Sequence, residues 1–338
     1  MLFKKATVVR ITGDIPVTAE AIEALIEKRK FVPAREMEFE RIGWVPPTQE
    51  EDAPLVFAQS NVYLMALKIQ TKILPDSVVK EELRERLAAR GAMGRKVRAK
   101  ERQQMMDDIR FDLLPKAFSR YVRIMGYIDA QRREIVIGSA SSAQVETFLS
   151  VLREDFGSLP VALLETDFPT QRRMTDWTKA QEAPSKVRFG QEISLLDHAE
   201  GGRGTFRKQD LHSEEILQCI DSGKLVDRIE LKWNDYLSIV VDDRLVLRKI
   251  APLDMFDDKF ESGDDAASAL DADLFLTSSA LRKLLPELYK WFDVSDPGVG
   301  VQGDGEEEET DFAASDYSPP EEDEIGLYDE HLTEELAL

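Results

Sequence analysis

The sequence contains almost no cysteine and very little histidine. Cys219 is the only cysteine among 338 residues, which excludes an intrachain disulfide and the CxxC pairs of zinc sites. The three histidines, His198, His212 and His331, do not have the spacing of a helical metal-binding pair. We therefore expect a protein of a reducing compartment that holds no metal and no cofactor.

Long apolar runs are also missing. No stretch approaches the roughly 18 apolar residues that a membrane-spanning helix requires. The first residues, MLFKKATVVRITGDI, contain neither the apolar segment nor the cleavage site of a signal peptide. These features predict a cytoplasmic protein without membrane contact.

Catalytic motifs are scarce. SGKLV lacks the first glycine and the hydroxyl residue of a P-loop, and HAEGGRG lacks the GxGxxG spacing. Aspartate pairs at 107–108, 242–243 and 257–258 keep a metal-dependent nuclease open as an alternative, although turns favour aspartate for backbone reasons alone. The sequence favours a protein that is not an enzyme.

Charge is distributed unevenly along the chain. The formal net charge is −21, but residues 296–338 hold sixteen Asp or Glu and no Lys or Arg, so the rest carries only −5. Residues 84–123 hold twelve basic and five acidic residues. Such polarity suggests a polyanionic partner. An acidic scaffold or DNA mimic acting through residues 296–338 is a second alternative.

Apolar periodicity predicts an α+β fold, with mixed or antiparallel sheets, packed helices and a protruding helical arm. Apolar residues at helical spacing predict a helix over about 18–29 and a last helix that begins near Ser278. The predicted parts are a central α+β region (1–75 and 116–170), the arm (76–115), a second α+β region that forms the base (171–292), and a disordered acidic tail (293–338).

The arm combines a packing face with a basic face. Arg95, Arg98 and Arg102 follow i, i+3, i+7 spacing, while apolar residues from Val97 onward follow another face. Guanidinium groups in such a row bind phosphates without reading bases. A merely solvated face is the alternative. Phe118 lies among basic residues, where it either stacks on a base or opens a strand as a core residue.

Seven stretches occur together in a characteristic order. They are MLFKK at the start, GWVPP at 43–47, KILPDSVVKEEL at 72–83, LLPKAFSRY at 113–121, LREDFGSLPV at 152–161, RKQDLHSEEI at 207–216 and DADLFL at 271–276. In sequence and approximate spacing, residues 1–292 resemble the recombination-associated protein RdgC family.

This resemblance implies a homodimer that closes into a ring with a positively charged hole for double-stranded DNA. Such a protein binds DNA, including single-stranded DNA as a further ligand, with little sequence preference. It is associated with the nucleoid and opposes the RecA recombinase. Phe118 matches the phenylalanine at the contact between the two arms, which bears on ring opening, and the KQD stretch matches the other dimer contact.

The predicted DNA-binding residues share a positive charge or lie in the KQD stretch. They are Arg84, Arg86, Arg90, Arg95, Lys96, Arg98, Lys100, Arg102, Lys116, Arg120, Lys208 and Gln209. Residues 296–338 depart from the family pattern. Our hypothesis is that this acidic tail competes with DNA for the basic hole, or recruits a partner through Ile325–Tyr328.

Overall fold

The computed structural model describes residues 1–338 except 49, 51, 93–96, 254–265 and 296–338. Twelve strands form one sheet in the order β2-β4-β5-β6-β1-β12-β11-β10-β8-β9, with β3 paired to β4 and β7 paired to β1. The strands are β1 (Lys5–Ile11), β2 (Glu40–Val45), β3 (Val56–Gln59), β4 (Val62–Ile73), β5 (Phe118–Asp129), β6 (Glu134–Ile137), β7 (Val161–Leu163), β8 (Val187–Leu196), β9 (Arg203–Arg207), β10 (Leu225–Trp233), β11 (Leu237–Asp242) and β12 (Leu247–Pro252). Every strand pair is antiparallel.

Seven α-helices lie in the described ranges. They are α1 (Ala19–Ile26), α2 (Asp76–Ala92), α3 (Ala99–Leu113), α4 (Ser142–Phe156), α5 (Thr170–Ala180), α6 (Glu214–Asp221) and α8 (Ala266–Phe292), with short 3-10 turns η1 (Glu27–Arg29) and η2 (Leu114–Lys116). None of these helices has an apolar stretch long enough to cross a bilayer.

Helices cover both faces of the sheet around β1. Val9 packs in a cluster with buried residues of α1 and α4, including Ile22 and Phe148. Its neighbour Val8 packs in a different cluster with residues of α8, including Leu281. Because successive side chains of a strand point to opposite faces, α1 and α4 lie on one face of this part of the sheet and α8 lies on the other.

Strand β1 joins the two halves of the sheet. Its first residues pair with β12, which leads to the strands β11, β10, β8 and β9. Its later residues pair with β6 and β7. The two α+β regions expected from the sequence are thus joined by one continuous sheet, and their division into separate units stays a prediction.

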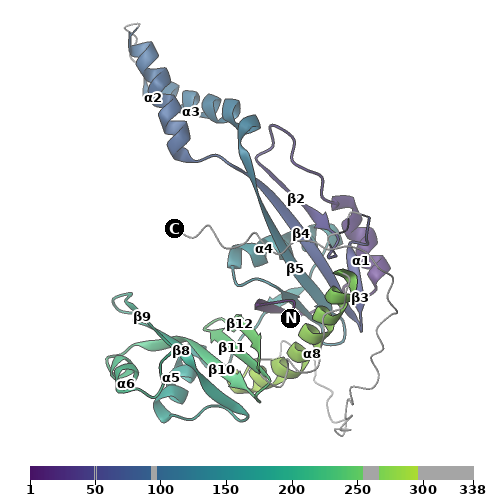
Figure 1. Ribbon diagram of the computed structural model, residues 1–338, viewed down its shortest axis with the longest axis vertical. Helices are drawn as coiled ribbons and strands as arrows, with labels where there is room; N and C mark the ends of the chain where they lie inside the picture. Colours follow the sequence, from purple (N-terminus) through teal and green to yellow (C-terminus); the bar gives the residue numbers. More distant parts are fainter. Residues whose placement is uncertain (49, 51, 93–96, 254–265, 296–338) are drawn as a thin grey trace.

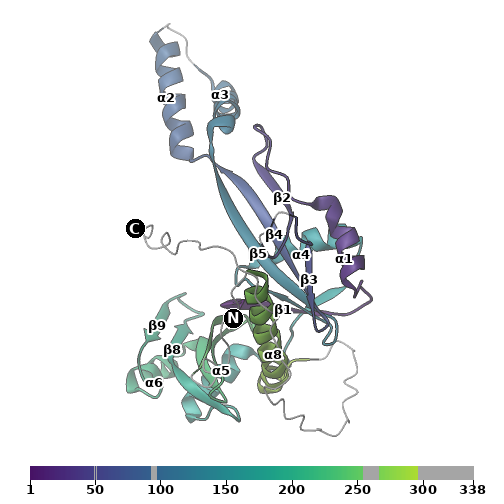
Figure 2. The ribbon, with the colours of Figure 1, turned by 45° about the vertical axis from the view of Figure 1, so that its right-hand side comes forward.

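The molecule has the outline of an open C (Figure 1). Helices α2 and α3 project from the long β4–β5 ribbon at one end, and β8, β9 and α6 form the other end (Figures 1 and 2). The α+β class and the antiparallel sheet predicted from the sequence are confirmed.

The predicted start of the last helix was wrong. Helix α8 already includes Ala266, about three turns before Ser278. Its early turns contain Leu270, Leu274 and Leu276, which pack against the larger core cluster. The threonine and two serines at 277–279 have low helix propensity, but Thr277 and Ser278 are buried inside α8, and this packing overrides that preference.

Candidate nucleic-acid interface

The arm is a helical hairpin with a small core of its own. Val79 and Leu83 of α2 pack against Met105 and Ile109 of α3, and Val97 adds to the edge of this cluster. The predicted apolar row from Val97 is thus the packing face. Because that face is occupied by the partner helix, the basic side chains on the remaining surface point to solvent.

Charge is separated along the arm. We call residues 90–102 the tip, and residues 76–89 with 103–113 the foot. The tip contains six basic residues and one acidic residue, whereas the foot contains four basic and seven acidic residues. Helix α2 runs away from the sheet and α3 returns to it, so the described tip residues, 90–92 and 97–102, lie at the far end of the arm (Figure 1).

The three arginines of the foot, Arg84, Arg86 and Arg110, are paired with the foot's own carboxylates. Arg84 forms an ion pair with Glu81, and Arg86 pairs with Glu82 at 2.8 Å and Asp112 at 2.9 Å. Hydrogen bonds to Glu82, and then to Asp112, raise the pKa of the Arg86 guanidinium. These two arginines therefore present much less free positive charge than the sequence suggested.

The basic residues of the tip differ from those of the foot. Arg90, Lys100 and Arg102 are exposed, and no ion pair to any of them occurs among the described residues. Arg98 is exposed as well, immediately before α3. Arg95 and Lys96 lie outside the described residues. The tip is the strongest candidate for phosphate contact on the arm.

The end of the β4–β5 ribbon next to the arm carries a second group of exposed side chains. Phe118 is 84% exposed and lies directly opposite Ile73, which is 47% exposed. Arg120, two residues further along β5, shares their face, and Lys116 precedes the strand in η2. The alternative that Phe118 is a core residue is excluded within this chain, because its ring is in solvent.

The opposite face of this ribbon contains an aromatic and cationic group that the sequence analysis missed. The Nζ atom of Lys68 lies 5.0 Å from the centre of the Tyr121 ring and 4.8 Å from that of Phe31. Tyr121 is 54% exposed. The sequence signal for this group is the alternation of side chains along KIQTK (68–72) and SRYVR (119–123). It shows that Lys68 and Tyr121 share a face only when the register of the β4–β5 pair is known.

Arg123 has a structural role. Its Nη2 atom donates hydrogen bonds of 2.7 Å to the carbonyl oxygens of Pro46 and Pro47. Burial lowers the pKa of this guanidinium. The adjoining Trp44 is fully buried and donates from Nε1 to Asp155 at 2.7 Å. The GWVPP stretch thus anchors the ribbon, and Arg123 should not be counted with the exposed charge.

Lys208 and Gln209 lie at the other end of the C, just after β9. Lys208 is exposed, with its backbone at a φ of 55°. Gln209 donates from its side chain to Glu215 at 3.0 Å, so its amide is already engaged. The structure does not bring these two residues next to the arm. It places them on the second of two separate ends (Figure 1).

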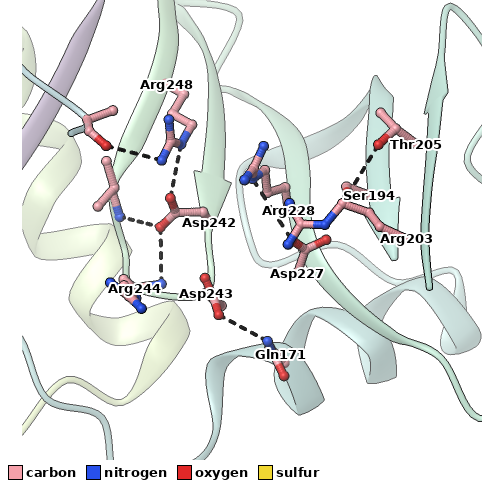
Figure 3. A network of polar contacts seen from close by, with 12 residues as sticks. Gln171, Ser194, Arg203, Thr205, Asp227, Arg228, Asp242, Asp243, Arg244 and Arg248 are labelled. Atoms are coloured by element: carbon pink, nitrogen blue, oxygen red, sulfur yellow. Dashed lines mark hydrogen bonds and ion pairs between the residues drawn. The ribbon is translucent and has the colours of Figure 1, made fainter. Parts of the chain in front are cut away.

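The aspartates that suggested metal binding have other partners. Asp242 accepts from two backbone amides of the following turn and from Arg248 Nε at 2.9 Å, while Asp243 accepts from an α5 glutamine at 3.0 Å (Figure 3). The pair 107–108 bonds with side chains of its own helix. Positions 257–258 lie outside the described residues. Within the described ranges, no three or more His, Cys, Asp or Glu residues are grouped to hold a metal.

Fold and surface together define an open-sided α+β protein that carries basic and exposed apolar side chains near one end of its C and a lysine at the other. A family model described as "Putative exonuclease, RdgC" matches residues 1–295. The chain belongs to the RdgC family.

Curated relatives agree with this membership. A protein of Halorhodospira halophila is 36% identical over 296 residues, which covers 86% of this chain and 98% of that protein. A protein of Pseudomonas syringae pv. syringae is 36% identical over 295 residues, covering 86% and 96%. One from Pseudomonas aeruginosa PAO1 is 35% identical with the same coverage. All three are named recombination-associated protein RdgC.

Proposed function

We propose that this protein binds DNA without sequence preference, encircles the duplex as a ring-shaped homodimer, and limits RecA-dependent recombination. It acts in the cytoplasm at the nucleoid, without catalysis. Support for the link to recombination comes from the relatives, whose names describe them as recombination-associated.

The observation that carries the proposal is the charge separation of the arm. The sequence of the tip holds six basic residues, and the four that the structure describes are exposed, while the foot pairs its arginines internally. Flexible, exposed Lys and Arg side chains neutralise backbone phosphates and release counterions, which gives affinity for any sequence. Contacts of this kind go to the DNA backbone and carry no sequence information.

Exposure of Phe118 supports the dimer. A phenylalanine that is 84% exposed, beside the exposed Ile73, is unusual for a protein that acts as a monomer, and Phe111 of α3 is 65% exposed as well. Burying these side chains against a second copy would remove their apolar surface from water. Two open C shapes joined at both ends would close a ring around the space between them.

The proposal is tested by measuring the binding of two unrelated duplexes at several salt concentrations, together with the mass of the protein in solution. We expect a dimer that binds both duplexes with equal affinity and a steep, equal salt dependence. A monomer, or a preference for one duplex, would contradict the proposal.

An exonuclease is the second candidate, since the family description contains that word. It predicts that a duplex labelled at its ends loses the label during incubation with Mg²⁺. The proposed function predicts that the duplex stays intact while it remains bound. A time course on one gel distinguishes the two, because binding and degradation are scored on the same DNA.

The effect on recombination is tested with RecA-driven strand exchange. If the protein acts by occupying duplex DNA, inhibition should disappear when an excess of unrelated duplex is added. Inhibition that survives this competitor would instead indicate direct contact with the recombinase.

A further inference from the structure

A polar cavity of about 310 Å³ lies where the two halves of the sheet meet. Its lining consists of Lys5 of β1, Arg248 of β12, the segment from Gly138 to Ser141, and Gln144 of α4. There is no carboxylate among these lining residues. The cavity thus combines two cationic side chains with hydroxyl and backbone groups.

The two cations lie directly opposite each other. Lys5 and Arg248 are partners in the register of the β1–β12 pair, so their side chains leave the same face of the sheet. Like charges in this position destabilise a sheet. Asp242 offsets Arg248 through a 2.9 Å contact, but no ion pair to Lys5 occurs among the described residues. A bound anion would remove this unfavourable arrangement.

The remaining wall is the start of helix α4. Ser141 is its N-cap residue but makes no side-chain capping bond, and the first turn contains no acidic residue. Ser139 is 5% exposed and fixes this corner by donating to Gln144 at 2.6 Å and accepting from the Ser141 amide at 3.1 Å. The first amides of the helix therefore remain available to an anion beside the two cations.

Arg248 is held in place by its contacts. Its Nε atom donates to Asp242, and its Nη2 atom donates to the Ala140 carbonyl at 3.3 Å (Figure 3). Neither bond uses Nη1. A guanidinium fixed in this way has little side-chain freedom to lose when it binds a ligand.

The cavity is positioned between the two ends of the C. In the strand order of the sheet, β1 lies between the β4–β5 ribbon that carries the arm and the strands β8 and β9. Helix α4 crosses behind the β4–β5 ribbon, and its C-terminal part is held beside η1 by the 2.8 Å contact of Asp155 with Arg29. Its N-terminal end therefore lies on the open side, where a duplex passing through the C would be.

We infer that this cavity is a binding site for a backbone phosphate of DNA, held by Lys5, Arg248 and the N-terminal amides of α4. The inference rests on the proposed function and adds a third contact point, on the part of the sheet that connects the arm-bearing ribbon to the end with Lys208. A DNA strand that crosses the open side would then contact the cavity as well as the two ends of the C.

Ser141→Asp tests the site without removing any packing. Aspartate is a good N-cap residue, so α4 should keep or gain stability, while its carboxylate repels a phosphate. Ser141→Asn is the matched control, because asparagine caps equally well and carries no charge. Lys5→Gln is the second variant, and Lys4→Gln is its control, since Lys4 is also exposed but does not line the cavity.

The readout is the affinity of the full-length protein for a short labelled duplex as a function of salt. We expect Ser141→Asp and Lys5→Gln each to weaken binding about fivefold at moderate salt, and to lower the slope of log K against log salt by about 0.9, as for one lost phosphate contact. The two controls should bind like the original protein, and thermal unfolding should show that all four variants are folded.

The possible failures are distinguishable. If the unmodified protein binds no duplex, the proposed function and this inference both fail. If it binds, but Lys5→Gln and Ser141→Asp match their controls, the inference alone is overturned. The last experiment measures the Tm of the protein with and without inorganic phosphate. If phosphate raises the Tm, Lys5→Gln abolishes this rise and duplex binding is unchanged, the cavity binds free phosphate. That result would overturn its assignment to DNA.

Discussion

Phe118 lies directly opposite Ile73 at the end of the β4–β5 ribbon, and both side chains are largely in solvent. The two residues close the ribbon where it meets the helical arm, so their exposure is not the result of a loose terminus. An apolar cross-strand pair of this kind contributes little to a sheet that leaves it in water. In the proposed dimer, a second copy would cover this pair.

The first prediction follows from this pair. Phe118→Ala should leave the folding stability of a single chain within about 0.5 kcal/mol, because the ring is exposed. It should weaken dimerisation by about 2 kcal/mol or more, as for an anchor residue of an interface. Sedimentation equilibrium measures this change. Leu163→Ala is the control, since Leu163 is 66% exposed on β7, and an equal effect of both changes would contradict the assignment.

The second prediction concerns the tip. Replacing Arg98, Lys100 and Arg102 together by Gln removes three exposed charges, so the salt slope of duplex binding should fall by up to about 2.7. If these side chains contact phosphates only, as proposed, the loss of affinity should be the same for unrelated sequences. Fluorescence anisotropy over a range of salt concentrations gives both quantities.

Arg84→Gln is the matched control in the foot. Arg84 is paired with Glu81 on the surface, and such a pair contributes less than about 1 kcal/mol to stability. We expect this variant to bind DNA almost as the original protein does. Equal losses from the foot and the tip variants would show that net charge alone, not the tip, determines binding.

The third prediction separates a structural arginine from a binding one on the same strand. Arg123→Gln removes the two donations to the Pro46 and Pro47 carbonyls and should lower the free energy of unfolding by about 2 kcal/mol. Arg120→Gln should leave stability unchanged and weaken DNA binding. Denaturant titration and anisotropy on both variants check this pattern, and the reverse pattern would refute it.

The fourth prediction addresses the acidic tail. Removing residues 296–338 deletes sixteen carboxylates, so a competition between tail and DNA predicts tighter duplex binding at low salt and a smaller difference at high salt. The control replaces the Asp and Glu residues of the tail by Asn and Gln at full length. If affinity and salt slope are unchanged in both proteins, the tail does not compete with DNA.

Much of the fold could be predicted from the sequence because its signals are local. Alternating and apolar runs identified β10, β11 and β12, and helical spacing identified α1 and both helices of the arm. Two of the family stretches have a structural role. GWVPP provides the carbonyl groups that Arg123 binds and contains Trp44, whose indole donates to Asp155 of LREDFGSLPV.

The candidate sites could be predicted only in part, because charge in sequence does not reveal pairing in space. Arg84 and Arg86 belong to the same basic window as Arg102. Helical spacing alone could have paired them with Glu81 and Glu82, but the contact of Arg86 with Asp112 depends on how the hairpin folds. Lys5 and Arg248 are more than two hundred residues apart. Their opposition depends on the β1–β12 register, for which no local pattern provides a signal.

The central claim, encirclement of duplex DNA, is tested most directly by comparing retention on a closed duplex circle with retention on the same duplex after linearisation. Both complexes are formed at low salt and then washed at high salt, which removes electrostatic contacts. The account predicts that protein stays on the circle and is lost from the linear duplex through its free ends. Equal loss from both would contradict it and reduce the protein to a binder held by its basic surface alone.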